Sequence, residues 1–325
     1  MSAPITLIQI ARPAGRPKAM VSLTIDGHGV SVPEGTSILT AAAGLGVTIP
    51  TLCYLETLRP VNVCRLCVVE VAGARVLVPS CARAVEPGMV VLTRSPRVVH
   101  ARRLVLELLA SSVDLSTAPG MAELLTEYGC DADRFGPPAP SSHGAARHVS
   151  IPGHHVLPDV EYAATVAQPV KVDNELYIRD YGKCVLCYKC VEACGPDHQN
   201  TFAIGIAGRG FDARISTEFA VALPESACVY CGNCIAVCPT GALMASREHE
   251  LRQSGNWREA EQTTGDTICP YCGVGCTLTL HVQDGEIVKA TSPLDNEITR
   301  GNLCIKGRFG WRFVQGPPSN PPPAW

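Results

Sequence analysis

The sequence predicts an α+β protein made of several small domains that are organised around cysteine side chains. Three observations support this fold class. Seventeen of the 325 residues are cysteines, and they occur in tight clusters. Short alternating stretches typical of strands are interspersed with stretches of helical periodicity. A cysteine pattern that starts at Cys184 recurs 44 positions later, which indicates an internal repeat.

Composition excludes some functions and favours metal binding. The 27 basic and 30 acidic residues give a formal charge of −3, so there is no electrostatic basis for nucleic-acid binding. Aromatic residues make up 5% of the chain, so the domains need another source of cohesion. Clustered cysteines form metal sites in reducing compartments, whereas disulfide frameworks belong to short secreted chains. Because the sequence also shows no signal peptide and no long apolar run, we expect a cytoplasmic metalloprotein.

The first folded domain is predicted at residues 20–112, after a flexible leader at residues 1–19. The stretch that begins at Met20 alternates like a strand, and the sequence "DGHG" predicts a hairpin turn. The segment "PEGTSILTAAAGLG" predicts a helix with Thr36 as its N-cap and glycines at its end. Later in the domain we expect three strands and an exit helix, at residues 67–71, 75–79, 89–93 and 96–110.

This domain contains the first set of four cysteines: Cys53, Cys64, Cys67 and Cys81. The spacing C-x10-C-x2-C-x13-C suits a [2Fe–2S] cluster, in which each of two irons takes two sulfurs. Two residues between the close pair allow one turn to point both sulfurs inward. A structural zinc site is the alternative, because zinc also accepts four cysteines. The long first gap and the preceding "TIPTLCYL" favour the iron–sulfur cluster.

Two further sets lie in residues 176–247, where C-x2-C-x2-C-x3-C occurs twice. This is the spacing of bacterial two-cluster ferredoxins, in which the fourth cysteine of each run serves the other cluster. One [4Fe–4S] cluster is therefore assigned to Cys184, Cys187, Cys190 and Cys238. The second is assigned to Cys194, Cys228, Cys231 and Cys234. Since all eight positions are already cysteine, His198 is expected to be an exposed loop histidine.

The fourth set follows a polar segment, residues 248–266, that is expected to be a linker. Residues 267–325 are predicted to form the last unit, with the strands "TLTLHV" and "EIVKAT" on either side of the turn "QDGE". Its cysteines have the spacing C-x2-C-x3-C-x27-C, and they are Cys269, Cys272, Cys276 and Cys304.

Four segments resemble known iron–sulfur proteins. "VNVCRLCVVEVAGARVLVPSCARAVEPGMVVLTRS" resembles the ferredoxin domain shared by the large iron–sulfur subunit of respiratory complex I, NAD-linked hydrogenase subunits and the alpha subunit of NAD-dependent formate dehydrogenases. "KCVLCYKCVEACGPDHQNTFAIGIAGRGFDARI" resembles the same formate dehydrogenase subunit. "TICPYCGVGCTLTLHV" and "SPLDNEITRGNLCIKGRFG" resemble the N-terminal [4Fe–4S] domain of molybdenum or tungsten formate dehydrogenases.

The resemblance implies a fold and a role for each unit. It implies a plant-type (β-grasp) [2Fe–2S] domain, a bacterial-type domain with two [4Fe–4S] clusters, and a small C-terminal [4Fe–4S] domain. In the formate dehydrogenase family the last cluster lies beside a pterin of the metal cofactor. Lys306, two residues after Cys304, would bridge the cluster and the pterin, because a cation there stabilises added electron density.

Related proteins carry one more [4Fe–4S] cluster, held in an H-x3-C-x2-C-x5-C pattern. Here "LELLASSVDLSTAPGMAELLTEYG" occupies that place without the ligands, so residues 113–175 are expected to be a degenerate segment and a linker with no cluster. Cys130 falls outside the pattern and is expected to be a plain buried or half-buried thiol. The alternative is a repurposed histidine ligand among the linker residues His143, His148, His154 and His155.

These features predict an electron-transfer subunit, or fragment, of a cytoplasmic NAD-linked formate dehydrogenase. It would relay electrons between a molybdenum or tungsten bis-pterin centre on another polypeptide and a subunit that binds FMN and NAD. No catalytic residue is assigned to this chain, because it lacks the pterin domain and is expected to be a split or truncated form. One alternative is a wiring subunit of an NAD-linked hydrogenase or complex I-like assembly. Another is a non-catalytic carrier with several clusters.

The iron content tests this interpretation. One two-iron and three four-iron clusters predict about 14 irons per chain in the purified holoprotein. A value near 18 irons, measured by metal analysis against protein concentration, would show that the degenerate segment holds a cluster. Removal of iron is expected to unfold the loops around the cysteines, since these loops have little else to organise them.

Overall fold

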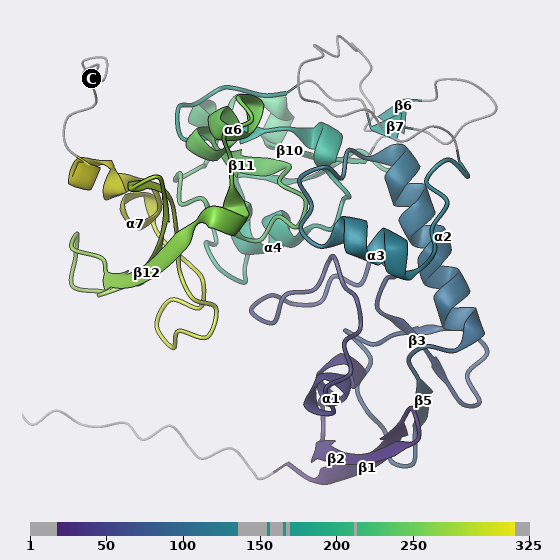
Figure 1. Cartoon of the computed structure of the whole chain (residues 1–325). Helices are drawn as coiled ribbons and strands as arrows, with labels where there is room; N and C mark the ends of the chain where they lie inside the picture. The colour runs from purple at the N-terminus through teal and green to yellow at the C-terminus, as the bar shows by residue number, and fades with distance from the viewer. Residues whose placement is uncertain (1–17, 136–154, 157–164, 167–169, 211–212, 316–325) are drawn as a thin grey trace, which may run out of the picture.

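The computed structural model describes residues 18–135, 155–156, 165–166, 170–210 and 213–315, which form three units (Figure 1). The first domain is followed by a two-cluster domain, named for its two cysteine runs, and by a C-terminal domain. The expected leader, the proline-rich linker and the histidines His143, His148 and His154 lie outside the described residues.

The first domain is a mixed five-stranded sheet with one helix packed against it. The strand order is β2-β1-β5-β3-β4, in which β1 runs parallel to β5 and the other pairs are antiparallel. Asp26 and Gly27 form the first turn with φ of 49° and 84°, as a two-residue type I′ hairpin requires. The predicted hairpin and strands are confirmed. The strands are β1 (Met20–Ile25), β2 (His28–Pro33), β3 (Val68–Val71), β4 (Val78–Pro79) and β5 (Val90–Leu92).

Helix α1 (Ile38–Gly44) covers one face of this sheet with its buried side chains, and its N-cap is Ser37. The Ser37 hydroxyl accepts a hydrogen bond from the Thr40 amide at 3.1 Å. The prediction of Thr36 as the cap was wrong by one residue. The Thr36 hydroxyl instead donates to the Pro33 carbonyl at 2.6 Å, which closes the turn before the helix and leaves the next hydroxyl to cap it.

Helix α2 (Pro96–Ser112) is the predicted exit helix, and α3 (Met121–Glu127) follows it without having been predicted. The two helices share a small core with Leu52 and Leu66, which lie beside cysteines of the first set. A buried guanidinium strengthens this junction, because Arg102 donates to the Tyr128 hydroxyl and to the Val68 carbonyl, both at 2.8 Å. The core therefore attaches the helices to the cysteine loops.

The two-cluster domain shows the predicted repeat. Each cysteine run ends in a short helix, α4 (Lys189–Cys194) or α5 (Asn233–Ala236). The domain is closed by an antiparallel pair of strands, which joins its two ends. Other elements precede, connect or follow the runs: β8 (Tyr177–Arg179), η1 (Tyr181–Lys183), β9 (Gly205–Ala207), β10 (Arg214–Ser216), η3 (Glu218–Ala220), η4 (Leu223–Glu225), β11 (Leu243–Ala245) and α6 (Ser246–Gln253). A separate short pair, β6 (His155–Val156) and β7 (Thr165–Val166), precedes the domain.

The C-terminal domain is a three-stranded antiparallel sheet with the order β12-β13-β14. β13 (Thr277–Gln283) and β14 (Glu286–Thr291) are the two predicted strands, so that prediction is confirmed. β12 (Thr263–Ile268) was not predicted, because all six of its residues are exposed and its sequence has no apolar alternation. The short elements η5 (Glu259–Glu261), α7 (Ile305–Phe309) and η6 (Gly310–Gln315) complete the domain.

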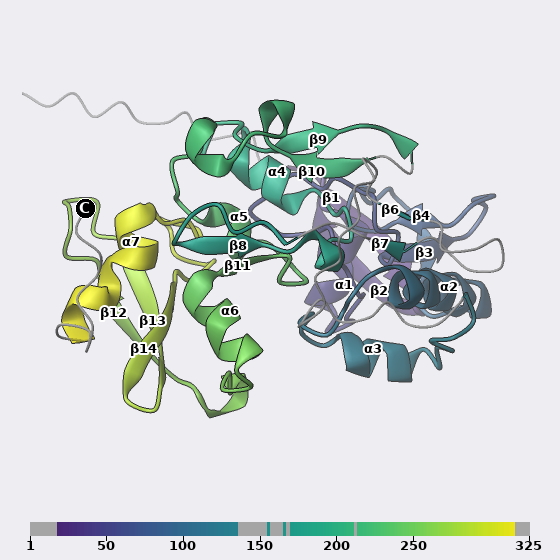
Figure 2. The ribbon, with the colours of Figure 1, turned by 90° about the horizontal axis from the view of Figure 1, so that it is seen from above.

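The two-cluster domain lies between the other two units, as the two views show (Figures 1 and 2). The loop that contains Cys53 inserts Leu58 into the core of the two-cluster domain. Arg59 in the same loop forms an ion pair with Asp197 at 3.2 Å, and its amide donates to that carboxylate at 2.6 Å. In the described part of the chain, no helix is long and apolar enough to cross a bilayer.

The degenerate segment contacts the two-cluster domain through a buried ion pair. Lys183, 1% exposed, pairs with Asp114, 3% exposed, and also donates to the Ser116 hydroxyl at 3.2 Å. The Thr117 hydroxyl donates to the Thr240 carbonyl at 2.7 Å. This segment therefore supplies a carboxylate and hydroxyl groups that bind the neighbouring domain.

Substitution of Lys183 tests how much this ion pair contributes to the free energy of unfolding. Lys183→Met removes the ammonium and leaves the buried Asp114 carboxylate without its cationic partner, so the free energy of unfolding should fall by about 3–5 kcal/mol. The double variant with Asp114→Leu should recover most of that loss. Urea titration followed by loss of cluster absorbance measures the change.

The exposed pair Arg83–Glu86 provides the matched control, since both side chains are about half exposed. Arg83→Gln is expected to change the free energy of unfolding by less than about 1 kcal/mol. Equal effects of the two substitutions would show that the buried pair has no special weight.

Candidate metal centres

The structure brings the four cysteines of the first set together in two hydrogen-bonded pairs. The Cys67 thiol lies 3.3 Å from the Cys81 sulfur, and the Cys64 amide donates to the Cys53 sulfur at 3.5 Å. Three of the four side chains are buried, and Cys64 is half-buried. Arg65, which follows Cys64, has a left-handed φ of 58°, so the chain turns sharply between the second and third cysteines.

The thiols of this set shift one another's pKa in opposite directions. Hydrogen bonds from Cys64 and Cys81 lower the pKa of Cys53, and the Cys81 thiol lowers the pKa of Cys67 to about 6. The pKa of Cys81 rises, because its thiol is the donor to Cys53 and Cys67 and because it is buried. Cys64 and Cys81 thus act as protonated donors that stabilise the thiolates of Cys53 and Cys67. A bound metal would displace the shared protons.

The second and third sets meet in the crossed arrangement. Cys184, Cys187, Cys190 and Cys238 line one apolar cavity, so the fourth cysteine of the second run joins three from the first. Cys194, Cys228, Cys231 and Cys234 line a second apolar cavity. Burial is the main cause that raises the pKa of Cys187 to about 12, and the charges of neighbouring cysteines raise it further. Deprotonating these thiols therefore requires a cation in each cavity.

Local backbone conformation points the thiols of both runs inward in the same way. The Leu186 amide donates to the Cys184 sulfur at 3.4 Å, and the Tyr230 amide donates to the Cys228 sulfur at 3.4 Å. Leu186 and Tyr230 have left-handed φ of 51° and 55°. The two runs are 44 residues apart and share this geometry, so the repeat extends from the sequence to the backbone. Amide hydrogen bonds of this kind stabilise a ligating thiolate.

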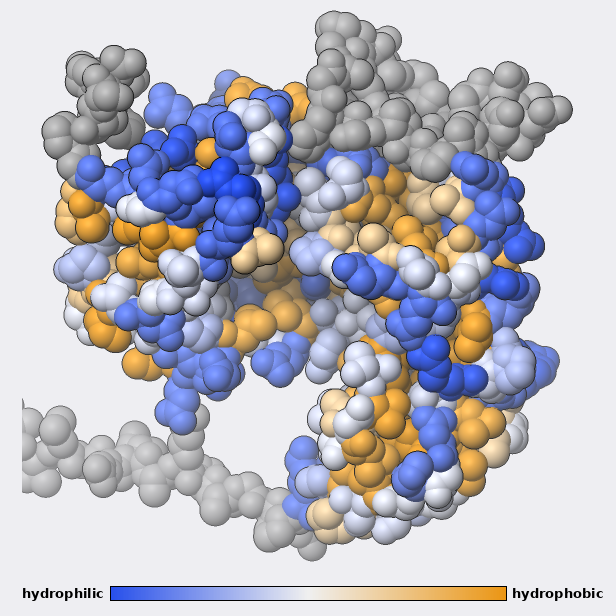
Figure 3. Space-filling model, viewed as in Figure 1, coloured by the Kyte–Doolittle hydropathy of each residue, from blue (hydrophilic) through white to orange (hydrophobic). Residues whose placement is uncertain are grey.

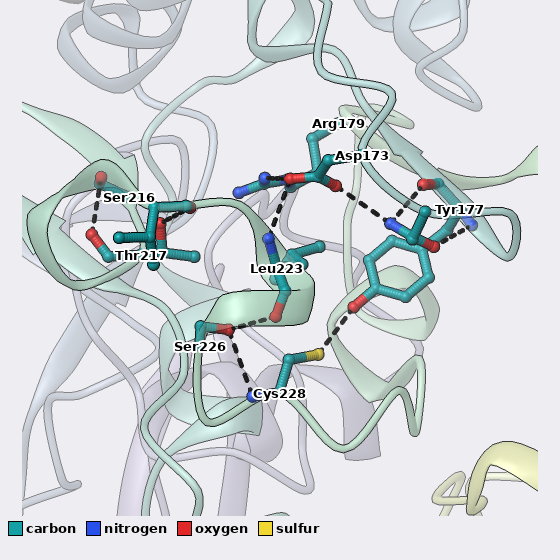
Figure 4. Close-up of polar contacts among 10 residues, drawn as sticks. Asp173, Tyr177, Arg179, Ser216, Thr217, Leu223, Ser226 and Cys228 are labelled. Carbon is teal, nitrogen blue, oxygen red and sulfur yellow. Dashed lines mark hydrogen bonds and ion pairs between the residues drawn. The ribbon is translucent and has the colours of Figure 1, made fainter.

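A polar network anchors Cys228, and two of its members, Tyr177 and Arg179, line the same cavity (Figure 4). The Tyr177 hydroxyl points at the Cys228 sulfur at 3.0 Å, and the Cys228 amide donates to the Ser226 hydroxyl at 3.2 Å. Asp173 accepts from the Leu223 amide at 3.0 Å and pairs with the buried Arg179. Sequence reasoning assigned no role to Tyr177 or Asp173, because neither belongs to a cysteine motif.

The fourth set is more open to solvent. Cys269 is buried and Cys276 is half-buried, whereas Cys272 and Cys304 are exposed. The Cys269 amide donates to the Cys276 carbonyl at 2.8 Å, and the charges of the other three cysteines add to burial in raising the pKa of Cys276. Lys306 is exposed, and its ammonium lies 5.8 Å from the centre of the Tyr271 ring.

Two residues outside the sets were also considered as ligands. Cys130 is half-buried in the α2–α3 core, as predicted, and burial raises its pKa. The prediction of an exposed His198 was wrong. Its ring is half-buried, its Nε2 donates to the Thr57 carbonyl at 3.2 Å, and burial lowers its pKa. The reason is that the loop of the first domain packs over it, a contact that local sequence does not reveal.

Among the described residues, no three His, Cys, Asp or Glu side chains are placed as ligands of one metal ion. A structural zinc ion would require four thiolates at about 2.3 Å from a single atom. The thiolates of an iron–sulfur cluster bind different irons, so they surround a larger volume.

Three family models match the three units. Residues 18–96 match the 2Fe-2S iron-sulfur cluster binding domain. Residues 183–242 match the 4Fe-4S dicluster domain, and residues 262–316 match the molybdopterin oxidoreductase Fe4S4 domain. The chain therefore contains a 2Fe-2S domain and 4Fe-4S domains, as the cysteine spacing predicted.

Curated relatives include a subunit of NADH-quinone oxidoreductase from Rhizobium meliloti, 33% identical over 91% of this chain and 32% of the relative. The NADP-reducing hydrogenase subunit HndD of Solidesulfovibrio fructosivorans is 40% identical over 71% of this chain and 37% of the relative. A putative formate dehydrogenase of Staphylococcus haemolyticus is 25% identical over 90% of this chain and 31% of the relative.

A solved structure of an NAD+-reducing [NiFe]-hydrogenase in the H2-reduced state is also similar. Its TM-score is 0.54 with 26% identity, over 70% of this chain and 88% of that one. The chain spans about a third of the length of the curated relatives it matches. These relatives include subunits of NAD(P)-linked oxidoreductases, and the three matched units of this chain are iron–sulfur domains.

Proposed function

We propose that this chain is the electron-transfer part of an NAD-linked oxidoreductase, and that the oxidoreductase is a formate dehydrogenase. It would relay electrons between a molybdenum or tungsten pterin centre on another polypeptide and a subunit that binds flavin and NAD. The single observation that carries the proposal is the gathering of sixteen of the seventeen cysteines into four sets across three contacting units.

The donor sets fit the clusters we assign to them. The first set would hold the [2Fe–2S] cluster, because its four cysteines are linked by hydrogen bonds into one group. The apolar cavities of the two-cluster domain are each lined by four thiols from both runs. When bound, the clusters would supply carriers of single electrons.

Contacts between the first domain and the two-cluster domain support transfer between the first set of cysteines and the second. The nearby Cys53 charge contributes, after burial and the Cys238 charge, to raising the pKa of Cys187. The intervening loop is fixed by Leu58 in the core and by the ion pair of Arg59 with Asp197. The first domain thus contacts the two-cluster domain directly, so the relay does not need a cluster in the degenerate segment.

The C-terminal domain has an exposed apolar surface that suits binding of a partner polypeptide. Cys272, Cys304 and Lys306 are exposed in the C-terminal domain, and large apolar side chains are exposed around them. These are Ile268 at 60%, Val274 at 57%, Phe313 at 63% and Val314 at 60%. Figure 3 shows apolar surface on this domain, at the left where α7 lies in Figure 1. Exposed apolar patches mark interaction sites, and a polypeptide that carries the pterin would cover this one.

The match of residues 262–316 to the molybdopterin oxidoreductase Fe4S4 domain supports a pterin partner, because a lysine bridge has no role without one. A second candidate is an electron-wiring subunit of an NAD(P)-linked hydrogenase. The 40% identity to a hydrogenase subunit and the similarity to the NAD+-reducing hydrogenase structure favour it. A complex I-like role is a variant of this second candidate, supported by the NADH-quinone oxidoreductase relative.

Purification of the chain with its native partners distinguishes these candidates. A formate dehydrogenase predicts molybdenum or tungsten, a flavin, and formate-dependent reduction of NAD in the purified complex. Nickel without a pterin would exclude that assignment and favour a hydrogenase. A chain that purifies with no partner and with its full iron content would instead be a free electron carrier.

Substitution of the fourth cysteine of the first run tests the crossed ligand assignment. Cys194→Ser should selectively perturb the cluster bound by Cys228, Cys231 and Cys234, because it leaves the three cysteines of its own run with Cys238. The expected result is a loss of up to about four irons and of one [4Fe–4S] signal in the electron paramagnetic resonance spectrum.

Cys130→Ser is the matched control and should leave the iron content and all signals unchanged, because this thiol belongs to no set. Cys194→Ser and Cys190→Ser should remove different signals, although the two residues belong to the same run. Loss of the same signal in both variants would contradict the crossing.

A further inference from the structure

Arg308 of α7 is a buried cation at the border between the C-terminal domain and the two-cluster domain. Its side chain is 5% exposed. The guanidinium Nε donates to the Cys231 carbonyl at 3.0 Å, and Nη2 donates to the Asn233 side-chain oxygen at 3.2 Å. Arg308 thus reaches from the helix that follows Cys304 into the loop that carries the cysteines of the second run.

The positive charge of Arg308 requires compensation, because the side chain is buried. No carboxylate forms an ion pair with it in the part of the chain that the structure describes. The Arg308 amide donates to the Cys304 carbonyl at 3.0 Å, and its guanidinium donates to the Cys231 carbonyl, so the residue contacts cysteines of two different sets. An arginine stays protonated at neutral pH, and burying an uncompensated charge is costly. Clusters bound by these two sets, with their anionic thiolate ligands, would supply the counter-charge.

A comparison within the repeat shows that the loop is built to receive this side chain. Gly232 precedes α5 with a φ of 68°, and Tyr188, 44 residues earlier, precedes α4 with a φ of 62°. Since tyrosine adopts this conformation in the first run, backbone conformation alone does not require glycine in the second. A Cβ atom at position 232 would lie 2.3 Å from Cδ of Arg308 and 3.1 Å from the Phe309 ring. The glycine makes room for α7.

Asn233 completes the connection between the two sets. Its side chain is 3% exposed, and its oxygen accepts from the Leu303 amide at 3.1 Å as well as from Arg308. Leu303 directly precedes Cys304, so the amide oxygen fixes the chain next to a cysteine of the fourth set. The neighbouring Phe309 stacks on Tyr177 with ring centres 6.3 Å apart, and Tyr177 contacts the Cys228 sulfur.

We propose that Arg308 is a positioning residue that two clusters share: the one bound by Cys194, Cys228, Cys231 and Cys234, and the one bound by Cys269, Cys272, Cys276 and Cys304. It holds the C-terminal domain against the second run and places one positive charge between the two clusters. This inference rests on the cluster assignments of the proposed function, but it does not depend on which enzyme the chain serves.

The charge of Arg308 should change the reduction potentials of the two clusters, which an uncharged structural contact would not do. Positive charge close to a cluster stabilises the reduced form, because reduction adds an electron, and so it raises the reduction potential. Arg308 should therefore raise the potentials of both neighbouring clusters together. The [2Fe–2S] cluster of the first domain should not be affected, since the hydrogen bonds of Arg308 reach only the two-cluster and C-terminal domains among the described residues.

Redox titration of the holoprotein, followed by electron paramagnetic resonance, tests this inference. In Arg308→Gln the reduced-to-oxidised ratio of the two neighbouring clusters should fall at least tenfold at a fixed potential, about 59 mV for a one-electron couple. Arg308→Lys keeps the charge but loses the planar fork of donors, so its shift should be less than half as large. The [2Fe–2S] signal serves as an internal reference and should not move.

Arg312→Gln is the matched control, because Arg312 is exposed in the adjacent element and should leave all potentials unchanged. If Arg308→Gln loses iron, the reduction potentials are measured in Gly232→Ala instead. A methyl group at position 232 displaces the guanidinium without removing its charge. Bound iron with unshifted potentials in these variants would overturn the role of Arg308 and leave the proposed function intact. A wild-type chain that binds no iron would overturn both.

Discussion

The fold depends on gathering negatively charged sulfur in places from which water is excluded. The pKa of Cys184, Cys190 and Cys234 is raised mainly by burial, so these thiols stay protonated unless a cation joins them. Cations of iron clusters meet this requirement, and binding them adds free energy to folding. A chain with 5% aromatic residues and short helices obtains much of its cohesion in this way.

Contacts between the units follow from the same constraint. Carriers of single electrons must lie close together, so the loops that hold the cysteines are also the loops that contact neighbouring domains. The loop between Cys53 and Cys64 supplies Leu58 to the core of the two-cluster domain. On the opposite side, α7 follows Cys304 directly and inserts Arg308 beside Cys231. The segment after α2 is held against the two-cluster domain by the ion pair of Lys183 with Asp114.

The sequence predicted what local spacing determines. Cysteine intervals predicted the sets, and turn residues predicted the hairpins of the first and last domains. Interactions between residues distant in sequence were not predictable. Nothing near His198 indicates that Thr57 covers it, and nothing near Lys183 indicates the Asp114 carboxylate 69 residues away. β12 was missed because an exposed edge strand has no apolar alternation, and Thr36 was chosen as a cap because two adjacent hydroxyl residues compete for that position.

The internal repeat shows how a duplicated motif acquires different neighbours. Both runs place a left-handed residue before their short helix, and both donate an amide to the first sulfur. They differ in the residue type at this left-handed position and at the one after it, where Tyr188 and Lys189 correspond to Gly232 and Asn233. In the second run these two residues receive the C-terminal domain, because one leaves space and the other supplies an acceptor. The spacing of the cysteines is therefore common to both runs, whereas the residues between the cysteines determine which domain each run contacts.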